Sequence, residues 1–352
     1  RKNSQLDPSF ILEPDLEYSS GGLGELNRIR WAGYLLNGDE SLLETNNLDS
    51  ISYSALEKAE RFFLQVRNHL QLFKKGQETQ LQYEAQREVA HSLGYEDQGD
   101  FLAVEVMMKE LEGHLYEIGL IANRFMELLR AWIALAAEEE VQPSREEVAP
   151  GMWVERGLLM VDSDKLESEG KGLLELFKQA VHLGVDLSVE AYQWAKTQAG
   201  YLPGSLEGQA ELRDWLFEII RAENSGIKTI RALYETEVLP NLIPELRPVH
   251  ALVQHDAFHL YPVHEHHLRT FAELKKLLNG EHDSDFPQIA EWANGIKDQE
   301  VLLLAGLIHD VGKSGGHGHA KRGGEMSPLI ADRLGLVDEE KELLSFLVVN
   351  HV

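Results

Sequence analysis

The sequence predicts an all-α protein of two to three domains, with its chemistry in the last third of the chain. Three observations support this prediction. Apolar residues recur at helical spacing from about residue 54 onward, and 352 residues are too many for one ordinary core. Eleven of the fifteen histidines fall between His250 and His351. Histidine is the commonest metal ligand and the usual proton carrier near neutral pH, so a functional site is expected there.

The composition excludes several classes of protein. A formal net charge of -26 argues against general nucleic-acid binding, because a phosphate backbone requires a basic surface. The chain has no cysteine, which excludes disulfides and thiolate zinc sites. No apolar run approaches the roughly 20 residues of a membrane span, and no signal peptide opens the sequence. We therefore expect a cytoplasmic protein that binds neither nucleic acid nor membranes.

A helical first domain is predicted over residues 1–140. Ser54 and Glu57 have the spacing of a capping box, which predicts a helix start at this point. Apolar residues then recur every three, four and seven positions and form one face. The positions on this face are Leu56, Phe63, Val66 and Leu70. Further helices are expected over about 81–93 and 101–136.

A helical connecting region is predicted over residues 141–245. The acidic segment from Glu138 to Pro150 contains two prolines and is typical of a linker. Residues 153–161 indicate a short hairpin that turns near Gly157, and no other strand is expected. Ser188 and Ser205 are candidate N-caps. The helices expected here cover about 172–182, 188–198, 205–222 and 226–237.

The strongest local signal lies in a third predicted domain, residues 246–352. An apolar segment, Leu302 to Ile308, leads directly to adjacent His309 and Asp310, followed by Val311-Gly312-Lys313. Adjacent helical residues do not share a face, so both can reach one ion only near the last turn of a helix. An imidazole together with a carboxylate suits Mn, Fe, Zn or Mg.

The string LIHDVGK around His309 resembles the HD phosphohydrolase superfamily, whose signature is a His, a His-Asp pair and a distal Asp. The resemblance implies that His266, His309 and Asp310 hold one metal ion. Members with two metal ions add two histidines after the pair, which His319 and His351 match here. Asp310 would then bridge the two ions. His264 and His267 flank His266 and are expected to point elsewhere on the helix. If His266 lies far from Asp310, His264 is the next candidate.

The string from Gln254 to His266 resembles a narrower family, the bifunctional uridylyltransferase/uridylyl-removing enzymes that modify the nitrogen-regulatory protein PII. Shorter similarities extend along the chain, at 13–23, 66–70 and 225–226. The nucleotidyltransferase core and the ACT domains of this family are not recognised in these residues. Glu17-Tyr18 and Gly24-Glu25 also depart from the residues that the transferase part is expected to carry.

The family resemblance implies metal-dependent phosphodiester hydrolysis that removes UMP from a uridylylated tyrosine of PII. The cofactor would be a divalent metal, most simply Mn or Mg, with Fe or Zn as alternatives. Lys313 is a candidate phosphate clamp, since its charge needs no partner within the motif itself. His255 or His259 is expected to carry a proton or orient a ligand.

Two alternatives stay open at this point. The chain could be an HD hydrolase of a free nucleotide or a cyclic dinucleotide. It could instead be a regulatory binding module whose site turns nothing over.

The distal Asp of the HD signature is expected beyond His351, so the third domain is predicted to be C-terminally incomplete. We expect the polypeptide to continue along a helix that supplies this carboxylate. Acidic residues just before His351 are expected to be bystanders: Asp332, Asp338, Glu339, Glu340 and Glu342. The sequences Asp162-Ser163-Asp164 and Asp283-Ser284-Asp285 resemble metal-binding pairs but are expected to be surface turns.

Overall fold

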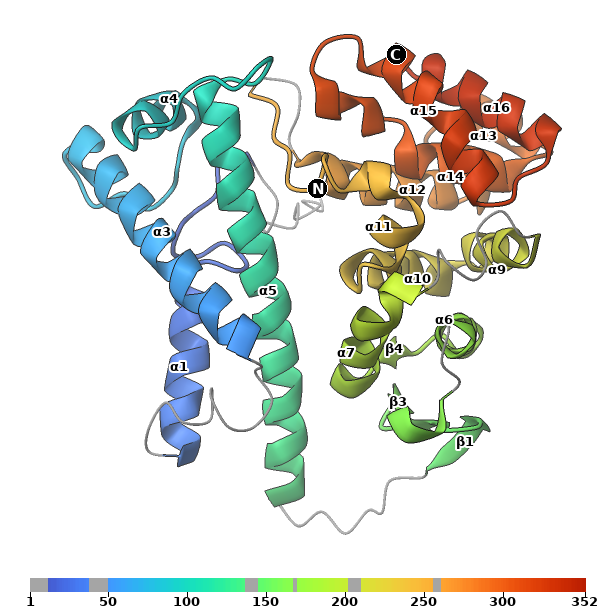
Figure 1. The fold of residues 1–352 in the computed structure, drawn as a ribbon, viewed down its shortest axis with the longest axis horizontal. Coiled ribbons are helices and arrows are strands. Elements are labelled where there is room, and N and C mark those ends of the chain that lie inside the picture. The colour runs from blue at the N-terminus through green and yellow to red at the C-terminus, as the bar shows by residue number, and fades with distance from the viewer. Residues whose placement is uncertain (1–11, 38–49, 137–144, 167–169, 202–209, 256–260) are drawn as a thin grey trace. The chain divides into compact units, whose positions relative to one another are not determined.

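The computed structural model describes residues 12–37, 50–136, 145–166, 170–201, 210–255 and 261–352 (Figure 1). The chain divides into two compact units. The first contains Arg1–Glu139 with His250–Glu265, and the second contains Glu140–Val249 with His266–Val352. The boundary predicted near residue 140 lies beside this division. The identities assigned to the three predicted domains stay predictions.

Four described helices make up most of the first unit. They are α1 (Leu23–Asn37), α3 (Ser50–Lys74), α4 (Tyr83–Ser92) and α5 (Ala103–Ala136). The 34-residue helix α5 packs against the other three. The predicted apolar face of α3 is confirmed, because Leu56, Phe63, Val66 and Leu70 are all buried in a shared core.

The predicted start of α3 is wrong. The helix begins at Ser50, so Ser54 and Glu57 lie within it. Both residue types are tolerated inside helices, and their spacing alone does not define a cap. In contrast, the predicted cap at Ser188 is confirmed, since its hydroxyl accepts a hydrogen bond from the Ala191 amide at 3.1 Å. Ser205 lies outside the described residues.

A small sheet opens the second unit. Its strands follow the order β1 (Glu146–Ala149), β2 (Met152–Glu155), β3 (Leu158–Val161) and β4 (Asp186–Leu187). The hairpin predicted near Gly157 is confirmed as β2–β3, with positive φ angles at Arg156 and Gly157. The limit of one hairpin is wrong, because β1 adds an antiparallel strand and β4 a short parallel one.

The strand β1 lies in the segment that the sequence indicated to be a linker. Its acidic residues Glu146 and Glu147 are exposed, and an edge strand tolerates such charges. Pro150 follows β1 and precedes β2, where no ladder hydrogen bond is required of it. The described protein is nevertheless mostly helical, as predicted.

Helices form the rest of the second unit. The middle region contains α6 (Lys171–Leu183), α7 (Val189–Gln198), α9 (Ala210–Arg221), α10 (Asn224–Glu235) and α11 (Val238–Leu242). The histidine-rich region contains α12 (Val263–Leu278), α13 (Pro287–Asn294), α14 (Gln299–Ile308), α15 (His319–Arg333) and α16 (Asp338–Val349). Short 3-10 helices are η2 (Ser163–Lys165), η3 (Ala199–Tyr201), η4 (Pro244–Leu246) and η5 (Val311–Gly315). Among the described residues, no helix has the length and apolarity that crossing a membrane would require.

Polar contacts join the middle region to the histidine-rich region within this unit. Arg213 of α9 makes a bidentate ion pair with Glu340 of α16. Arg333 of α15 makes another with Glu245, at 3.0 and 3.1 Å. The buried ammonium of Lys275 donates to main-chain carbonyls at the end of α9. The helices that carry the histidines are therefore held on a shared scaffold.

Candidate metal centre

Two helices, α12 and α14, bring the first histidines together. His266 lies in the first turns of α12, and His309 directly follows α14 at its C-cap. A Cβ atom on Gly306 of α14 would lie 2.7 Å from Leu274 Cδ1 of α12, so a larger residue here would require that side chain to shift. In this arrangement of the two helices, the separation between His266 Nε2 and His309 Nε2 is 3.0 Å.

The adjacent His309 and Asp310 reach one centre because α14 ends at Ile308, as the sequence required. Asp310 then begins η5, and Gly312 in η5 packs against the start of α15. A Cβ atom on Gly312 would lie only 2.0 Å from the His319 carbonyl oxygen. This close approach brings His319 next to the carboxylate of Asp310.

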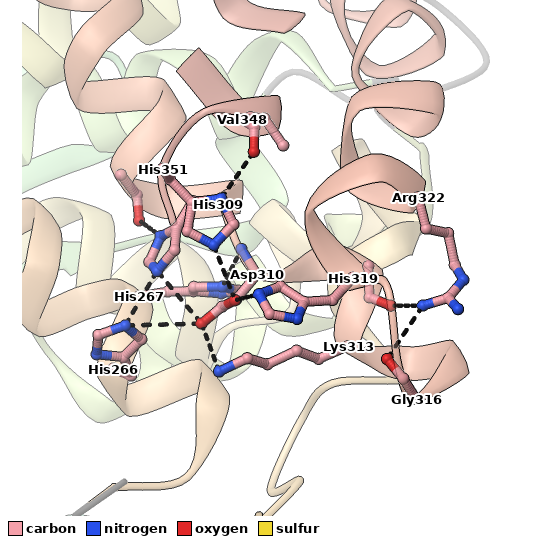
Figure 2. A network of polar contacts seen from close by, with 12 residues as sticks. His266, His267, His309, Asp310, Lys313, Gly316, His319, Arg322, Val348 and His351 are labelled. Atoms are coloured by element: carbon pink, nitrogen blue, oxygen red, sulfur yellow. Dashed lines mark hydrogen bonds and ion pairs between the residues drawn. The ribbon is translucent and has the colours of Figure 1, made fainter. Parts of the chain in front are cut away.

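The carboxylate of Asp310 is shared by two groups of histidines (Figure 2). Its Oδ2 lies 3.3 Å from His309 Nε2 and 3.7 Å from His266 Nε2. Its Oδ1 lies 3.4 Å from both His319 Nε2 and His351 Nε2. Within each group, the candidate ligand atoms all lie within 4.8 Å of one another. The structure thus brings together all five residues that the sequence singled out as metal ligands.

Main-chain carbonyls orient two of these imidazoles. His309 Nδ1 lies 3.0 Å from the Gly306 carbonyl oxygen, and His351 Nδ1 lies 2.7 Å from the Val348 carbonyl oxygen. A carbonyl can only accept, so each Nδ1 carries the proton and donates it. Nε2 is thereby left as the ring nitrogen that faces the centre, which is the arrangement that orients a metal-binding histidine.

Lys313 lies one turn of η5 beyond Asp310, and both side chains are buried. Its Nζ lies 2.8 Å from Asp310 Oδ2. The ammonium therefore has a partner within the motif, although the sequence did not require one. Residues three apart meet in a single turn of a 3-10 helix, which explains the pairing. A role of Lys313 as a phosphate clamp stays a prediction.

Electrostatics keep Asp310 charged. Burial alone would raise the pKa of this carboxyl, but the hydrogen bond and charge of His309, together with the charge of Lys313, bring the pKa well below its ordinary value. Oδ1 is buried and accepts no hydrogen bond from the described residues. A charged, buried carboxylate with an oxygen left unsatisfied in this way requires a cation or a donor nearby.

These observations fit a divalent metal. The Nε2 atoms of His266 and His309 face each other at 3.0 Å, and such an approach requires a proton or a cation between them. Four imidazoles converge on one carboxylate, and this set of nitrogen and oxygen donors suits Mn, Fe, Zn or, with fewer nitrogens, Mg.

One residue at the centre was missed from the sequence. His267 was expected to point away from it, because it is adjacent to His266 on a helix. Its ring instead lies beside that of His309, with centroids 5.1 Å apart, and its Nε2 accepts a hydrogen bond from the Asp310 amide at 3.3 Å. No signal in the sequence distinguishes such a contact, since it depends on where α14 ends relative to α12.

Of the two predicted proton carriers, the structure describes only His255. His259 falls outside the described residues. His255 belongs to the first unit, where its ring stacks on Tyr83 with centroids 4.0 Å apart. Burial lowers the pKa of His255, which favours the neutral ring. Its role stays a prediction.

The acidic residues expected to be bystanders belong to neither histidine group. Glu340 pairs with Arg213, while Asp332 and Asp338 both lie within ion-pair distance of Lys341.

A cavity of about 580 Å³ in the same unit is separate from the centre. Residues of α6, of α9 and of the turn that joins β1 to β2 line this cavity, and none of its lining residues is a histidine.

The fold and site define a mostly helical protein with an imidazole–carboxylate centre that can hold one or two divalent metal ions. Comparisons with known proteins agree with the family indicated by the sequence motifs. A family model described as GlnD PII-uridylyltransferase matches residues 1–126. Over nearly all its length, the chain is similar to proteins named bifunctional uridylyltransferase/uridylyl-removing enzyme.

Three of these relatives illustrate the extent of the match, and each carries the name bifunctional uridylyltransferase/uridylyl-removing enzyme. The one from Novosphingobium aromaticivorans is 28% identical over 98% of this chain, and the one from Phenylobacterium zucineum is 28% identical over 97%. The one from Rhodospirillum rubrum is 27% identical over 98%. This chain spans only 39%, 38% and 38% of the lengths of the three relatives, respectively.

Proposed function

We propose that this chain is a metal-dependent phosphodiester hydrolase that removes UMP from a uridylylated PII-type signalling protein. The observation that carries the proposal is the convergence of four histidines on the carboxylate of Asp310. The name of these relatives includes a uridylyl-removing activity, which supports the choice of substrate. The domain around the centre would be of the HD type.

In this proposal, His266, His309 and Asp310 hold one divalent ion, and Asp310, His319 and His351 hold a second. A metal bound here would supply a nucleophilic water near neutral pH and stabilise the charge that develops on the phosphate oxygens. The main-chain carbonyls behind His309 and His351 keep both Nε2 atoms directed at the centre. Asp310 contributes one oxygen to each group, and Lys313 holds its carboxylate in a buried position.

The hydrolysis would join the oxygen of water to phosphorus and break the bond between phosphorus and the tyrosine oxygen. UMP and the free tyrosine side chain are the products, and the tyrosine oxygen takes up a proton. The sequence suggests His255 or His259 for proton transfer.

An assay of UMP release tests the proposal against both alternatives. The chain is incubated with Mn²⁺ and a uridylylated PII-type protein, and UMP is separated by chromatography, with a chelator as the control. Release that requires Mn²⁺ supports the proposal. Hydrolysis of a free nucleotide or a cyclic dinucleotide, without release from PII, would support an HD hydrolase of a small substrate. Metal binding without turnover of any substrate would instead indicate a regulatory binding module.

A further inference from the structure

A second histidine of α12, His267, contacts the peptide that joins His309 to Asp310. Its side chain is buried, with 2% of the residue exposed. The amide of Asp310 donates to His267 Nε2 at 3.3 Å, and the His267 ring meets the His309 ring nearly edge-on. His267 therefore contacts both candidate ligands without belonging to either group of ligand atoms.

The chemistry of this contact is unusual for a residue with only a packing role. An imidazole that accepts at Nε2 carries its proton on Nδ1 when it is neutral. His267 Nδ1 is buried and has no hydrogen-bond partner among the described residues. A buried donor without a partner destabilises the fold, so an apolar side chain would pack there more favourably. The acceptor at Nε2 is what the histidine adds.

The acceptor has a specific task at this position. The Asp310 amide belongs to the start of η5, where the first N–H groups of a helix have no partner within the helix. Fixing this amide fixes the plane of the peptide between His309 and Asp310. The imidazole of His309 and the carboxylate of Asp310 leave the backbone at the two ends of this peptide.

We propose that His267 is a positioning residue of the metal centre, which holds the His309–Asp310 peptide so that both side chains meet the same ion. The inference rests on the proposed metal site but not on the identity of the substrate. In this proposal, His267 contributes to the affinity for the metal and not to substrate binding.

His264 offers a matched comparison on the same helix. It lies three residues before His267, is 1% exposed, and accepts a main-chain hydrogen bond from the Ala251 amide at 3.1 Å. Its neighbours are the rings of Tyr116 and His250, and the amide that it binds is not that of a candidate ligand. A purely structural role of a buried histidine in α12 would make the two positions equivalent.

The test uses three variants of the full chain, with Mn²⁺ alone as the probe. His267→Phe keeps a ring but removes the acceptor, and His267→Gln restores an acceptor oxygen near the position of Nε2. His264→Phe makes the same change at the matched position. Mn²⁺ binding is measured by isothermal titration calorimetry well below each unfolding midpoint, and stability is measured by thermal unfolding in chelator.

His267→Phe should weaken Mn²⁺ binding about 10- to 100-fold, which is the typical effect of removing a residue that orients a ligand. His267→Gln should bind nearly as wild type, and His264→Phe should lose stability without losing affinity. Unchanged binding in His267→Phe, or equal weakening in His264→Phe, would overturn the inference. Wild-type binding of Mn²⁺ without UMP release would reject the proposed function and leave this inference standing. A wild-type chain that binds no Mn²⁺ would overturn both.

Discussion

Two buried carboxyl groups, Glu112 in the first unit and Asp310 in the second, have opposite electrostatic environments. Each residue is 2% exposed. Burial raises the pKa of Glu112 to about 8, and no hydrogen bond to its Oε1 comes from the described residues. Burial acts in the same direction on Asp310, but His309 and Lys313 hold its pKa well below the ordinary value. Neighbouring charge, and not depth, therefore decides which carboxyl stays ionised.

This difference separates a structural acid from a candidate ligand. A protonated carboxyl is a poor metal ligand, since binding requires the deprotonated form. Asp310 is held charged among four imidazoles, whereas Glu112 belongs to neither metal-binding group. The isosteric change of a carboxylate to an amide should consequently have very different effects at the two positions.

The largest effect is expected for Asp310→Asn. This change removes the charge and one ligand oxygen that the two histidine groups share. Affinity for Mn²⁺ should fall by more than about 100-fold, because even residues that only orient ligands contribute about 10–100-fold. UMP release should be lost as well. Calorimetric titration with Mn²⁺ measures the first effect, and the chromatographic assay measures the second.

Glu112→Gln is the matched control for that experiment, since it makes the same chemical change at equal burial. It should leave Mn²⁺ affinity at the wild-type value. Equal losses in the two variants would show that buried carboxyls act on this centre through stability alone. Asp310 would then have no special role.

The next effect distinguishes the two histidine groups. His309→Ala and His319→Ala should each reduce the number of Mn²⁺ ions bound per chain from two to one. The side chain of His309 is 11% exposed and anchored through Nδ1 to the Gly306 carbonyl, whereas the side chain of His319 is 26% exposed. We expect affinity for the remaining ion to fall about 10-fold or more in His309→Ala, and less in His319→Ala. Binding of one ion by wild type, with loss of that ion in both variants, would instead indicate a single ion shared by all four histidines.

A smaller effect is expected for Lys313→Met, and it concerns stability. The change leaves the buried carboxylate of Asp310 without its nearest cation. In chelator, the free energy of unfolding should fall by about 3–5 kcal/mol, which is typical of breaking a buried ion pair. Saturating Mn²⁺ should reduce this loss, because a bound ion supplies positive charge at the same carboxylate. Urea unfolding with and without Mn²⁺ measures both values, and an identical loss in the two conditions would contradict this account.

The fold was predictable where local signals decided it. Helical periodicity identified the buried face of α3, and glycine at 157 identified the hairpin turn. The strand β1 was not predictable, because its residues form a strand only through pairing with β2, and the segment is acidic. The start of α3 was misplaced because a serine and a glutamate three residues apart occur inside helices as well as at their ends.

The candidate site likewise contains residues that the sequence identified and contacts that it did not. The five converging residues, His266, His309, Asp310, His319 and His351, were identified from a motif and from a family resemblance. The pairing of Lys313 with Asp310 and the contact of His267 with the Asp310 amide could not be identified in this way. Both depend on the geometry of η5 relative to α14 and α12, which no spacing in the sequence encodes.

The smallest effect is the pH dependence that Glu112 contributes to stability. Its pKa is raised from the ordinary value of 4.5 to about 8 in the folded chain, so the folded state binds a proton more tightly than the unfolded state does. The stabilising contribution of the neutral carboxyl is therefore complete below about pH 4.5 and is lost as the pH rises toward 8. Glu112→Gln stays neutral throughout. Urea unfolding in chelator at about pH 5, 6 and 7 should give wild type an additional loss of roughly 1 kcal/mol per pH unit relative to the variant. Other groups titrate in both proteins and cancel in the difference. Parallel pH profiles would show that Glu112 is ionised in the folded chain, and the contrast with Asp310 would then fail.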